Sequence, residues 1–138
     1  MKRRYILSLV YKLNKMNKNL AITSFLGAVT IILGAFGAHS LKDTLDTVAM
    51  NSFETAVRYQ MYHVIALLIV NAFAKFSDKD KNAISYLFFG GIICFSGSIY
   101  AISFGVDASN IWFITPFGGL LFIIGWLKMA RSFLHVQK

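Results

Sequence analysis

The stretch LAITSFLGAVTIILGAFGAHSL, residues Leu20–Leu41, indicates the fold class, because no charged residue interrupts it between Lys18 and Lys42. A helix needs about 20 predominantly apolar residues to cross the roughly 30 Å hydrocarbon core of a bilayer. Backbone polar groups inside lipid have to pair within their own segment, so such a run forms a helix rather than a strand or loop. The stretch therefore predicts a membrane span at about residues 20–41.

Three more apolar runs follow and predict spans at about residues 57–76, 84–106 and 111–134. The chain has 138 residues, of which 57% are apolar, and its mean hydropathy is +0.60. A water-soluble domain of this size keeps too much surface wet to hide that composition. We therefore predict an all-α membrane protein, an antiparallel bundle of four transmembrane helices over residues 20–134. A basic segment, 1–19, precedes the bundle and a short tail, 135–138, follows it.

The segment Asp43–Arg58 lies between the first two spans and mixes apolar with polar residues. Leu45, Val48 and Phe53 have the spacing of one face of a helix, among acidic, amide and basic side chains. This pattern is typical of an amphipathic helix at the membrane interface. We expect an interfacial helix there, leading into the second span.

The charged residues predict an orientation. Twelve of the fourteen Lys and Arg residues fall before the first span, between the second and third spans, or at the C-terminal end. Cytoplasmic loops carry an excess of these residues, so both termini are expected in the cytoplasm, with the chain in the cell (inner) membrane. The basic residues flank apolar runs and form no patch interleaved with aromatics, so we expect lipid and no nucleic acid as partner.

The N-terminal segment has several interpretations. A cleaved signal peptide competes with a first span, but residues 20–41 are longer than a signal-peptide core and end in no clean A-x-A site. Met1–Lys15 is either a short basic amphipathic helix on the anionic inner leaflet or a segment upstream of a true start at Met16. The sequence leaves these last two interpretations open.

Small residues recur at four-residue spacing in the apolar runs, which lets helix backbones approach closely in a membrane. We expect them to pack helices within the monomer rather than to form a dedicated oligomer face. The predicted packing residues are Gly34, Gly37, Gly90, Gly97, Ser98, Ala101, Gly118 and Gly119. Pro116 lies early in the fourth span, where it should kink or start the helix because it lacks a backbone donor.

The polar residues with possible chemistry gather near the outer ends of the first two spans. The candidate functional cluster is His39, Arg58, Tyr59, Gln60, Tyr62 and His63. Two imidazoles from neighbouring helices can ligate haem or a divalent metal. They can instead form hydrogen bonds within an aromatic belt at the interface. We favour the second interpretation and predict no cofactor and no metal, because no third ligand type stands at metal spacing.

The rest of the sequence offers little for catalysis or pumping. No charged residue lies near the centre of a span, which disfavours proton-coupled transport, and Cys94 is a lone cysteine in apolar surroundings. We expect no enzymatic activity and a structural or accessory role, as a homo-oligomer or with a larger membrane partner. The alternative is a passive channel or small-solute carrier whose outward vestibule is the candidate functional cluster. A haem- or metal-binding membrane subunit is the third hypothesis.

Four blocks of sequence resemble a known family. They are Gly34-Ala-Phe-Gly-Ala-His39, Arg58-Tyr-Gln-Met-Tyr-His63, Phe95-Ser-Gly-Ser-Ile-Tyr100 and Thr115-Pro-Phe-Gly-Gly119, the last followed by Gly125-Trp126. In this order, over roughly Asn17–Phe133, the chain is similar to the small bacterial inner-membrane proteins of the YgdD and YwdK type. The resemblance implies a four-span membrane protein of a domain-of-unknown-function family, with no established activity and no catalytic residues to carry over. Such proteins begin just before the first span, so Met1–Lys15 departs from the pattern.

Overall fold

A computed structural model describes residues 2–136, and this part of the chain is helical, with turns and no strand. Two of the segments are π-helical turns, η1 and η2, that continue the α-helix preceding them. In chain order the elements are α1 (Lys2–Phe36), η1 (Gly37–Leu41), α2 (Thr47–Ala72), α3 (Asp78–Gly91), η2 (Ile92–Ser96), α4 (Gly97–Ser103), α5 (Ala108–Ile111) and α6 (Ile114–Val136).

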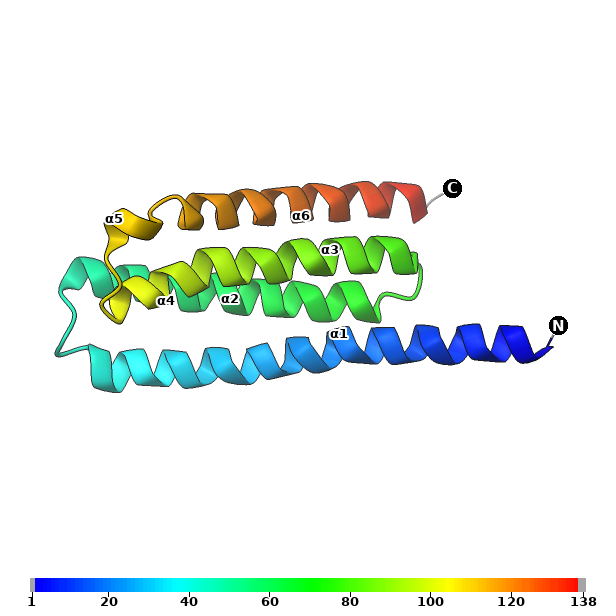
Figure 1. The fold of residues 1–138 in the computed structure, drawn as a ribbon, viewed down its shortest axis with the longest axis horizontal. Helices are drawn as coiled ribbons and strands as arrows, with labels where there is room; N and C mark the ends of the chain where they lie inside the picture. The colour runs from blue at the N-terminus through cyan, green and yellow to red at the C-terminus, as the bar shows by residue number, and fades with distance from the viewer. Residues whose placement is uncertain (1, 137–138) are drawn as a thin grey trace.

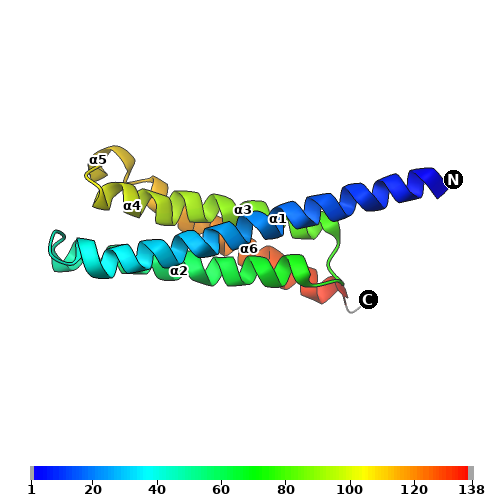
Figure 2. The same ribbon diagram turned by 90° about the horizontal axis from the view of Figure 1, so that it is seen from below.

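Four long helical rods lie side by side, and neighbours along the chain run in opposite directions (Figure 1). The rods are α1 with η1, α2, the continuous α3–η2–α4 segment, and α6. The chain enters and leaves the bundle at the same end, and α1 extends beyond the other rods there (Figures 1 and 2). Three segments are long and apolar enough to cross a membrane: Lys18–Leu41, Asp78–Ser103 and Ala108–Val136. The prediction of an all-helical protein is confirmed, with three candidate spans among the described residues.

The second predicted span is absent from those three, although α2 has 26 residues. The N-terminal two thirds of α2 carry Glu54, Arg58, Gln60 and His63, which lower its mean hydropathy. The structure places α2 against α1 and against the α3–η2–α4 segment. Gln60 and His63 are buried there, 2% and 4% exposed. Two of the polar side chains that lower the hydropathy of α2 are thus covered by the neighbouring helices.

The predicted interfacial helix is not a separate element. Residues 42–45 form a turn, and α2 starts at Thr47 and continues through the predicted segment without a break. Asp46 precedes the helix with extended backbone, and its carboxylate accepts a 2.8 Å hydrogen bond from the Ala49 N–H. An aspartate in this position caps the free N–H groups of a helix start. The amphipathic pattern therefore belongs to the first half of α2.

Two other helices start in the same way. Ser77 accepts a 3.1 Å hydrogen bond from the Asp80 N–H at the start of α3. Asp107 accepts one of 2.9 Å from the Ser109 N–H at the start of α5. Hydrogen bonds from the backbone and side chain of Ser109 lower the pKa of the Asp107 carboxyl, because they stabilise its charged form. These caps set where the chain turns at the two ends of the bundle.

Glycines bring α6 into close contact with the third rod. A Cβ built on Gly118 would lie 2.3 Å from the backbone nitrogen of Phe95, and one on Gly125 would lie 2.5 Å from the Phe88 ring. A Cβ on Gly91 would similarly lie 2.4 Å from the Phe122 ring. The buried residues of α6 recur at alternating spacings of four and three, as in a helix-packing seam: Gly118, Phe122, Gly125, Met129 and Ser132.

The other predicted packing residues divide into tight and loose positions. Gly37 and Gly90 are tight positions, where an added Cβ would be crowded. A Cβ on Gly37 would lie 2.7 Å from the Phe53 ring, and one on Gly90 would lie 3.2 Å from the Leu121 side chain. At Gly34, Gly97 and Gly119 the nearest atoms would be 3.5, 3.9 and 3.8 Å away, so these glycines are not required by a close approach.

Two further predicted packing residues, Ser98 and Ala101, lie on α4. The Ser98 and Thr115 hydroxyls are 2.6 Å apart and hydrogen-bonded between α4 and α6, whereas Ala101 is half-buried.

Pro116 is the third residue of α6 and lies in its first turn. The first N–H groups of a helix have no partner in the preceding turn, so a missing donor costs little there. Of the two predicted roles, a kink or a helix start, the structure shows the start.

Candidate functional site

His63 is at the centre of an aromatic cluster between α2, α3 and α6. Its ring stacks on Phe122, with centroids 3.5 Å apart and planes at 9°, and meets the edge of Phe88 at 5.0 Å. The Trp126 indole Nε1 lies 3.0 Å from His63 Nε2, and the Tyr59 carbonyl oxygen lies 2.7 Å from Nδ1. Three side chains from α3 and α6 and one backbone carbonyl of α2 therefore converge on one imidazole.

The hydrogen bonds define the tautomer of His63. An indole N–H only donates, so Nε2 accepts from Trp126. The proton of the neutral ring is then on Nδ1, which donates to the carbonyl of Tyr59. Both ring nitrogens are thus engaged within the bundle, and neither offers a lone pair to a metal without breaking a hydrogen bond. This geometry favours the hydrogen-bonding interpretation of His63 over the ligand interpretation.

A groove opens beside this cluster, between α2 and α6. Its volume is about 510 Å³, and Tyr59, His63 and Phe122 form one wall with Trp126. The α6 residues that complete the lining are Pro116, Gly119, Leu120 and Ile123. Leu120 and Ile123 are about half exposed, so the groove opens at the side of the bundle, where a membrane protein meets lipid. We call this the α2–α6 groove.

The structure does not bring His39 and His63 together, in contrast to the predicted cluster. His39 lies in η1 and is exposed. Gly37 of η1 abuts Phe53, and His63 lies ten residues further along α2, a rise of about 15 Å at 1.5 Å per residue. The sequence-based prediction placed both histidines near the same membrane interface. The packing of α1 against α2 instead puts them at different depths.

The remaining predicted members point in different directions from α2. Gln60 is buried, donates to the carbonyl of Leu26 at 3.3 Å, and accepts from the Tyr100 hydroxyl at 3.0 Å. It joins three rods. Arg58 and Tyr62 are each 55% exposed, and Tyr62 contacts the Tyr59 ring. The structure therefore separates the predicted cluster into an inward pair, Gln60 and His63, and an outward group, Arg58, Tyr59 and Tyr62.

A second polar cluster lies at the end of the bundle where the termini meet. The Asn19 side-chain amide donates to the amide oxygens of Asn71 and Asn82, each at 3.2 Å, and Asn71 donates to the Ser85 hydroxyl at 2.9 Å. The Lys81 ammonium donates to the Asn71 carbonyl at 3.0 Å. We call these five residues the amide network; it joins α1, α2 and α3.

The amide network was not predicted. Asn71 is a polar residue inside an apolar run, which is a signal of a buried hydrogen bond, but Asn19, Lys81 and Asn82 lie beside charged residues at the ends of runs and look solvated. Lys81 is nevertheless 7% exposed. Its ammonium meets the C-terminal turn of α2, where the helix dipole favours a cation. Asn19 is 52 residues from Asn71 and 63 residues from Asn82, and no local sequence pattern indicates that these side chains meet.

An ion pair also joins the third rod to α6 near this end. Lys128 of α6 donates to the carboxylate of Asp80 of α3, and Asp80 accepts a further hydrogen bond from the Ser77 hydroxyl at 2.8 Å. The two charged side chains are 33% and 28% exposed. The contact ties the α2–α3 turn to α6, so the amide network and the ion pair together hold all four rods.

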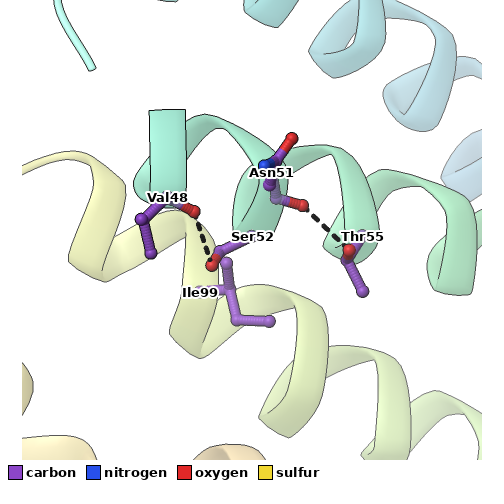
Figure 3. Close-up of a pocket in the computed structure, with 5 residues that line it drawn as sticks. All are labelled: Val48, Asn51, Ser52, Thr55 and Ile99. Carbon is purple, nitrogen blue, oxygen red and sulfur yellow. Dashed lines mark hydrogen bonds between the residues drawn. The ribbon is translucent and has the colours of Figure 1, made fainter. Parts of the chain in front are cut away.

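A polar groove of about 320 Å³ lies on the outer half of α2, against Ile99 of α4 (Figure 3). Its hydroxyls are directed back to their own helix: Ser52 donates to the Val48 carbonyl at 3.0 Å and Thr55 to that of Asn51 at 2.8 Å. Such bonds leave the hydroxyls little capacity to bind a ligand. Elsewhere within residues 2–136, no three His, Cys, Asp or Glu side chains gather as a metal site.

Comparison with known proteins gives the chain a family. Residues 33–119 match a family described as "Protein of unknown function (DUF423)". A UPF0382 membrane protein of Haemophilus influenzae is 40% identical over 114 residues, which cover 83% of this chain and 91% of that protein. One from Staphylococcus epidermidis is 42% identical over 76% of this chain and 88% of its own length. The UPF0382 membrane protein YwdK of Bacillus subtilis is 38% identical, over 76% and 89%.

No solved structure matches this chain. The matched residues include Gly37 and His39 of η1, His63 and Phe88 of the aromatic cluster, and the start of α6, whereas Phe122 and Trp126 lie beyond the match. The resemblance to the YgdD and YwdK type is confirmed by the relatives, which are named as membrane proteins. This chain therefore belongs to the DUF423 family and is a membrane protein of unknown function.

Proposed function

We propose that the protein is a structural or accessory component of the cell (inner) membrane, without enzymatic activity, which assembles with a second copy or with a larger membrane protein. One observation carries the proposal. Among the side chains that the structure describes, every buried nitrogen and oxygen has a hydrogen-bond partner inside the bundle. The buried polar groups are therefore used to hold helices together rather than to line a path for a solute.

The proposal includes four spans, with α2 as the second, and both termini in the cytoplasm. Support comes from the four antiparallel rods and from the basic residues gathered at the end where both termini lie. The test uses single cysteines in a Cys94→Ser background and a membrane-impermeant maleimide on intact cells. We expect Thr44→Cys and Ser109→Cys to be labelled, and Lys79→Cys to be labelled only after permeabilisation. Labelling of Lys79→Cys alone in intact cells would invert the topology.

Assembly with a partner is tested by crosslinking in cells, followed by extraction in mild detergent and mass spectrometry of the complex. We expect a defined species larger than the 15.5 kDa chain, either a homo-oligomer or a complex with one other membrane protein. Recovery of the monomer alone, at native expression level and with efficient crosslinking of a known complex in the same cells, would contradict the accessory role.

The second candidate is a passive channel or small-solute carrier. It is favoured by the α2–α6 groove, where Tyr59 and His63 from the predicted vestibule line a common space. Flux through proteoliposomes decides between the two functions. The accessory role predicts the flux of empty liposomes for ions, water and small neutral solutes. Flux above that level, altered by Arg58→Ala or His63→Ala, would favour the carrier. The distance between the histidines and the engaged nitrogens of His63 disfavour haem ligation.

A further inference from the structure

A small groove lies between α1 with η1 and the outer half of α2, on the surface of the bundle. Its volume is about 210 Å³. Gly34, Gly37 and Ala38 line one side, where the Phe53 ring packs against Gly37, and the apolar side chains of α2 form the opposite wall. The lining is completed by Met50, Phe53, Val57 and two charged residues, Glu54 and Arg58.

The two charges form a loose pair with unused bonding capacity. Arg58 Nη1 lies 3.8 Å from Glu54 Oε2, beyond hydrogen-bond distance, and the side chains are 55% and 52% exposed. Arg58 also donates to the Thr55 hydroxyl at 3.2 Å. A guanidinium has five N–H donors, so most of its donors remain available. Among the described residues, the Glu54 carboxylate has only the contact with Arg58.

The pair lies deeper than a water-exposed loop. A Cβ on Gly34 would lie 3.5 Å from the Val57 side chain, so Val57 and its neighbour Arg58 lie beside Gly34 of α1. Gly34 is seven residues before Leu41, the end of the apolar run. At 1.5 Å per residue this is about 10 Å inside the end of the apolar run. An exposed charge at this depth is costly unless headgroups or water reach it. The bilayer therefore has to supply polar atoms at the rim of the groove.

The arrangement of charges selects one class of headgroup. The cation suits a phosphate, and the carboxylate one helical turn away suits an ammonium with N–H donors. Cβ atoms at i and i+4 are about 5–6 Å apart, and the charged atoms of Arg58 and Glu54 are 3.8 Å apart. These separations are comparable to the short linker between phosphate and amine in phosphoethanolamine. A purely anionic headgroup would be repelled by Glu54, and a choline headgroup has no N–H to donate. The apolar walls beside the pair then receive the upper part of an acyl chain.

We propose that the groove lined by Gly34, Gly37, Val57, Glu54 and Arg58 binds a phospholipid with a primary-amine zwitterionic headgroup. Arg58 contacts the phosphate, Glu54 the ammonium, and the apolar walls of the groove the acyl chain. In the predicted topology this lipid belongs to the outer leaflet. The inference concerns lipid selectivity and does not depend on whether the protein has a protein partner.

The test measures lipid retained by the purified full-length protein. Phosphatidylethanolamine, phosphatidylcholine and phosphatidylglycerol with identical acyl chains are added in mixed micelles, and bound lipid is counted by native mass spectrometry. We expect phosphatidylethanolamine to be retained at least about tenfold better than the other two, as expected for two charge-assisted contacts. Equal retention of the three lipids would overturn the proposal.

Variants assign the contacts. Arg58→Gln should reduce retention of all phospholipids at this site, while Glu54→Gln should abolish the preference for ethanolamine over choline but keep binding. Both residues are exposed, so the variants should fold, which circular dichroism and gel filtration check. Arg131→Gln, an exposed charge at the opposite end of the bundle, is the matched control and should change nothing. Unchanged selectivity in Arg58→Gln and Glu54→Gln would place the lipid elsewhere and refute the site.

Discussion

The indole N–H of Trp126 donates to Nε2 of His63 across 3.0 Å, joining the second half of α6 to the middle of α2. The same imidazole stacks on Phe122 and donates to the carbonyl of Tyr59. A single neutral side chain thus connects two rods whose backbones are held apart, and its two nitrogens have different roles. The arrangement has consequences for stability that can be measured pair by pair.

The His63–Trp126 hydrogen bond predicts a coupling energy. Replacing His63 by Phe removes the acceptor, and replacing Trp126 by Phe removes the donor; each change leaves the other polar group unpaired. Unfolding of both single variants and the double variant in mixed micelles should give a coupling of about 1 kcal/mol, within the range for interhelical bonds in membranes. Additive effects of the two changes would contradict the bond.

Trp126 fluorescence provides an independent readout of the same contact. In a Trp112→Phe background Trp126 is the only tryptophan that emits, because the chain has two, and selective excitation of tryptophan excludes the tyrosines. We expect His63→Phe to shift and brighten this emission, since the indole loses its hydrogen-bond acceptor. An unchanged spectrum would show that the two rings are not in contact.

Gly118 predicts a steric effect at the closest approach of two rods. Gly118→Ala places a methyl group 2.3 Å from the backbone nitrogen of Phe95. This nitrogen belongs to the helix backbone of the third rod, so it cannot move aside by a rotamer change as a side chain could. We expect a loss of about 1–3 kcal/mol in unfolding free energy. Gly97→Ala is the matched control: its nearest atom is 3.9 Å away, so it should be neutral or slightly stabilising through helix propensity. Equal effects of the two changes would be inconsistent with a close seam.

The amide network predicts that one apolar substitution destabilises three rods. Asn71→Leu preserves approximate shape but removes one of the two acceptors of the Asn19 amide and the donor to the buried Ser85 hydroxyl. An unsatisfied buried polar group costs about 1–3 kcal/mol, so unfolding should shift by at least that range. Ser24→Ala, an exposed hydroxyl bonded only to its own helix, is the control and should stay within about 0.5 kcal/mol.

The Asp80–Lys128 ion pair predicts rescue by charge exchange. Asp80→Lys and Lys128→Asp should each lower stability, because each places like charges across α3 and α6. The double variant should recover most of the loss. The pair is partly exposed, so the coupling should be about 1 kcal/mol and should decrease with added salt. A double variant no more stable than either single variant would contradict a direct interaction.

Local sequence properties were sufficient for the fold class. Hydropathy and charge belong to each segment alone, so the run Leu20–Leu41 and the two long runs of the C-terminal half were predicted without knowing what they pack against. Capping also depends on a few consecutive residues. Asp46 lies within the segment predicted to form an interfacial helix, and in the structure it caps the start of α2. The same reasoning singled out Gly37 and Gly118 as packing positions.

Contacts between distant residues were decided only by the packed bundle. His39 and His63 looked alike in sequence, yet the register of α1 against α2 separated them by depth, because Gly37 admits Phe53 and not a residue near His63. Lys81 looked like a solvated charge, yet α3 carries it to the Asn71 carbonyl at the end of α2. Helical periodicity gives the face on which a residue lies but not the height of its neighbour. The axial position of that neighbour depends on the register of one helix along the next. In this protein, glycine contacts and buried amide hydrogen bonds determine that register.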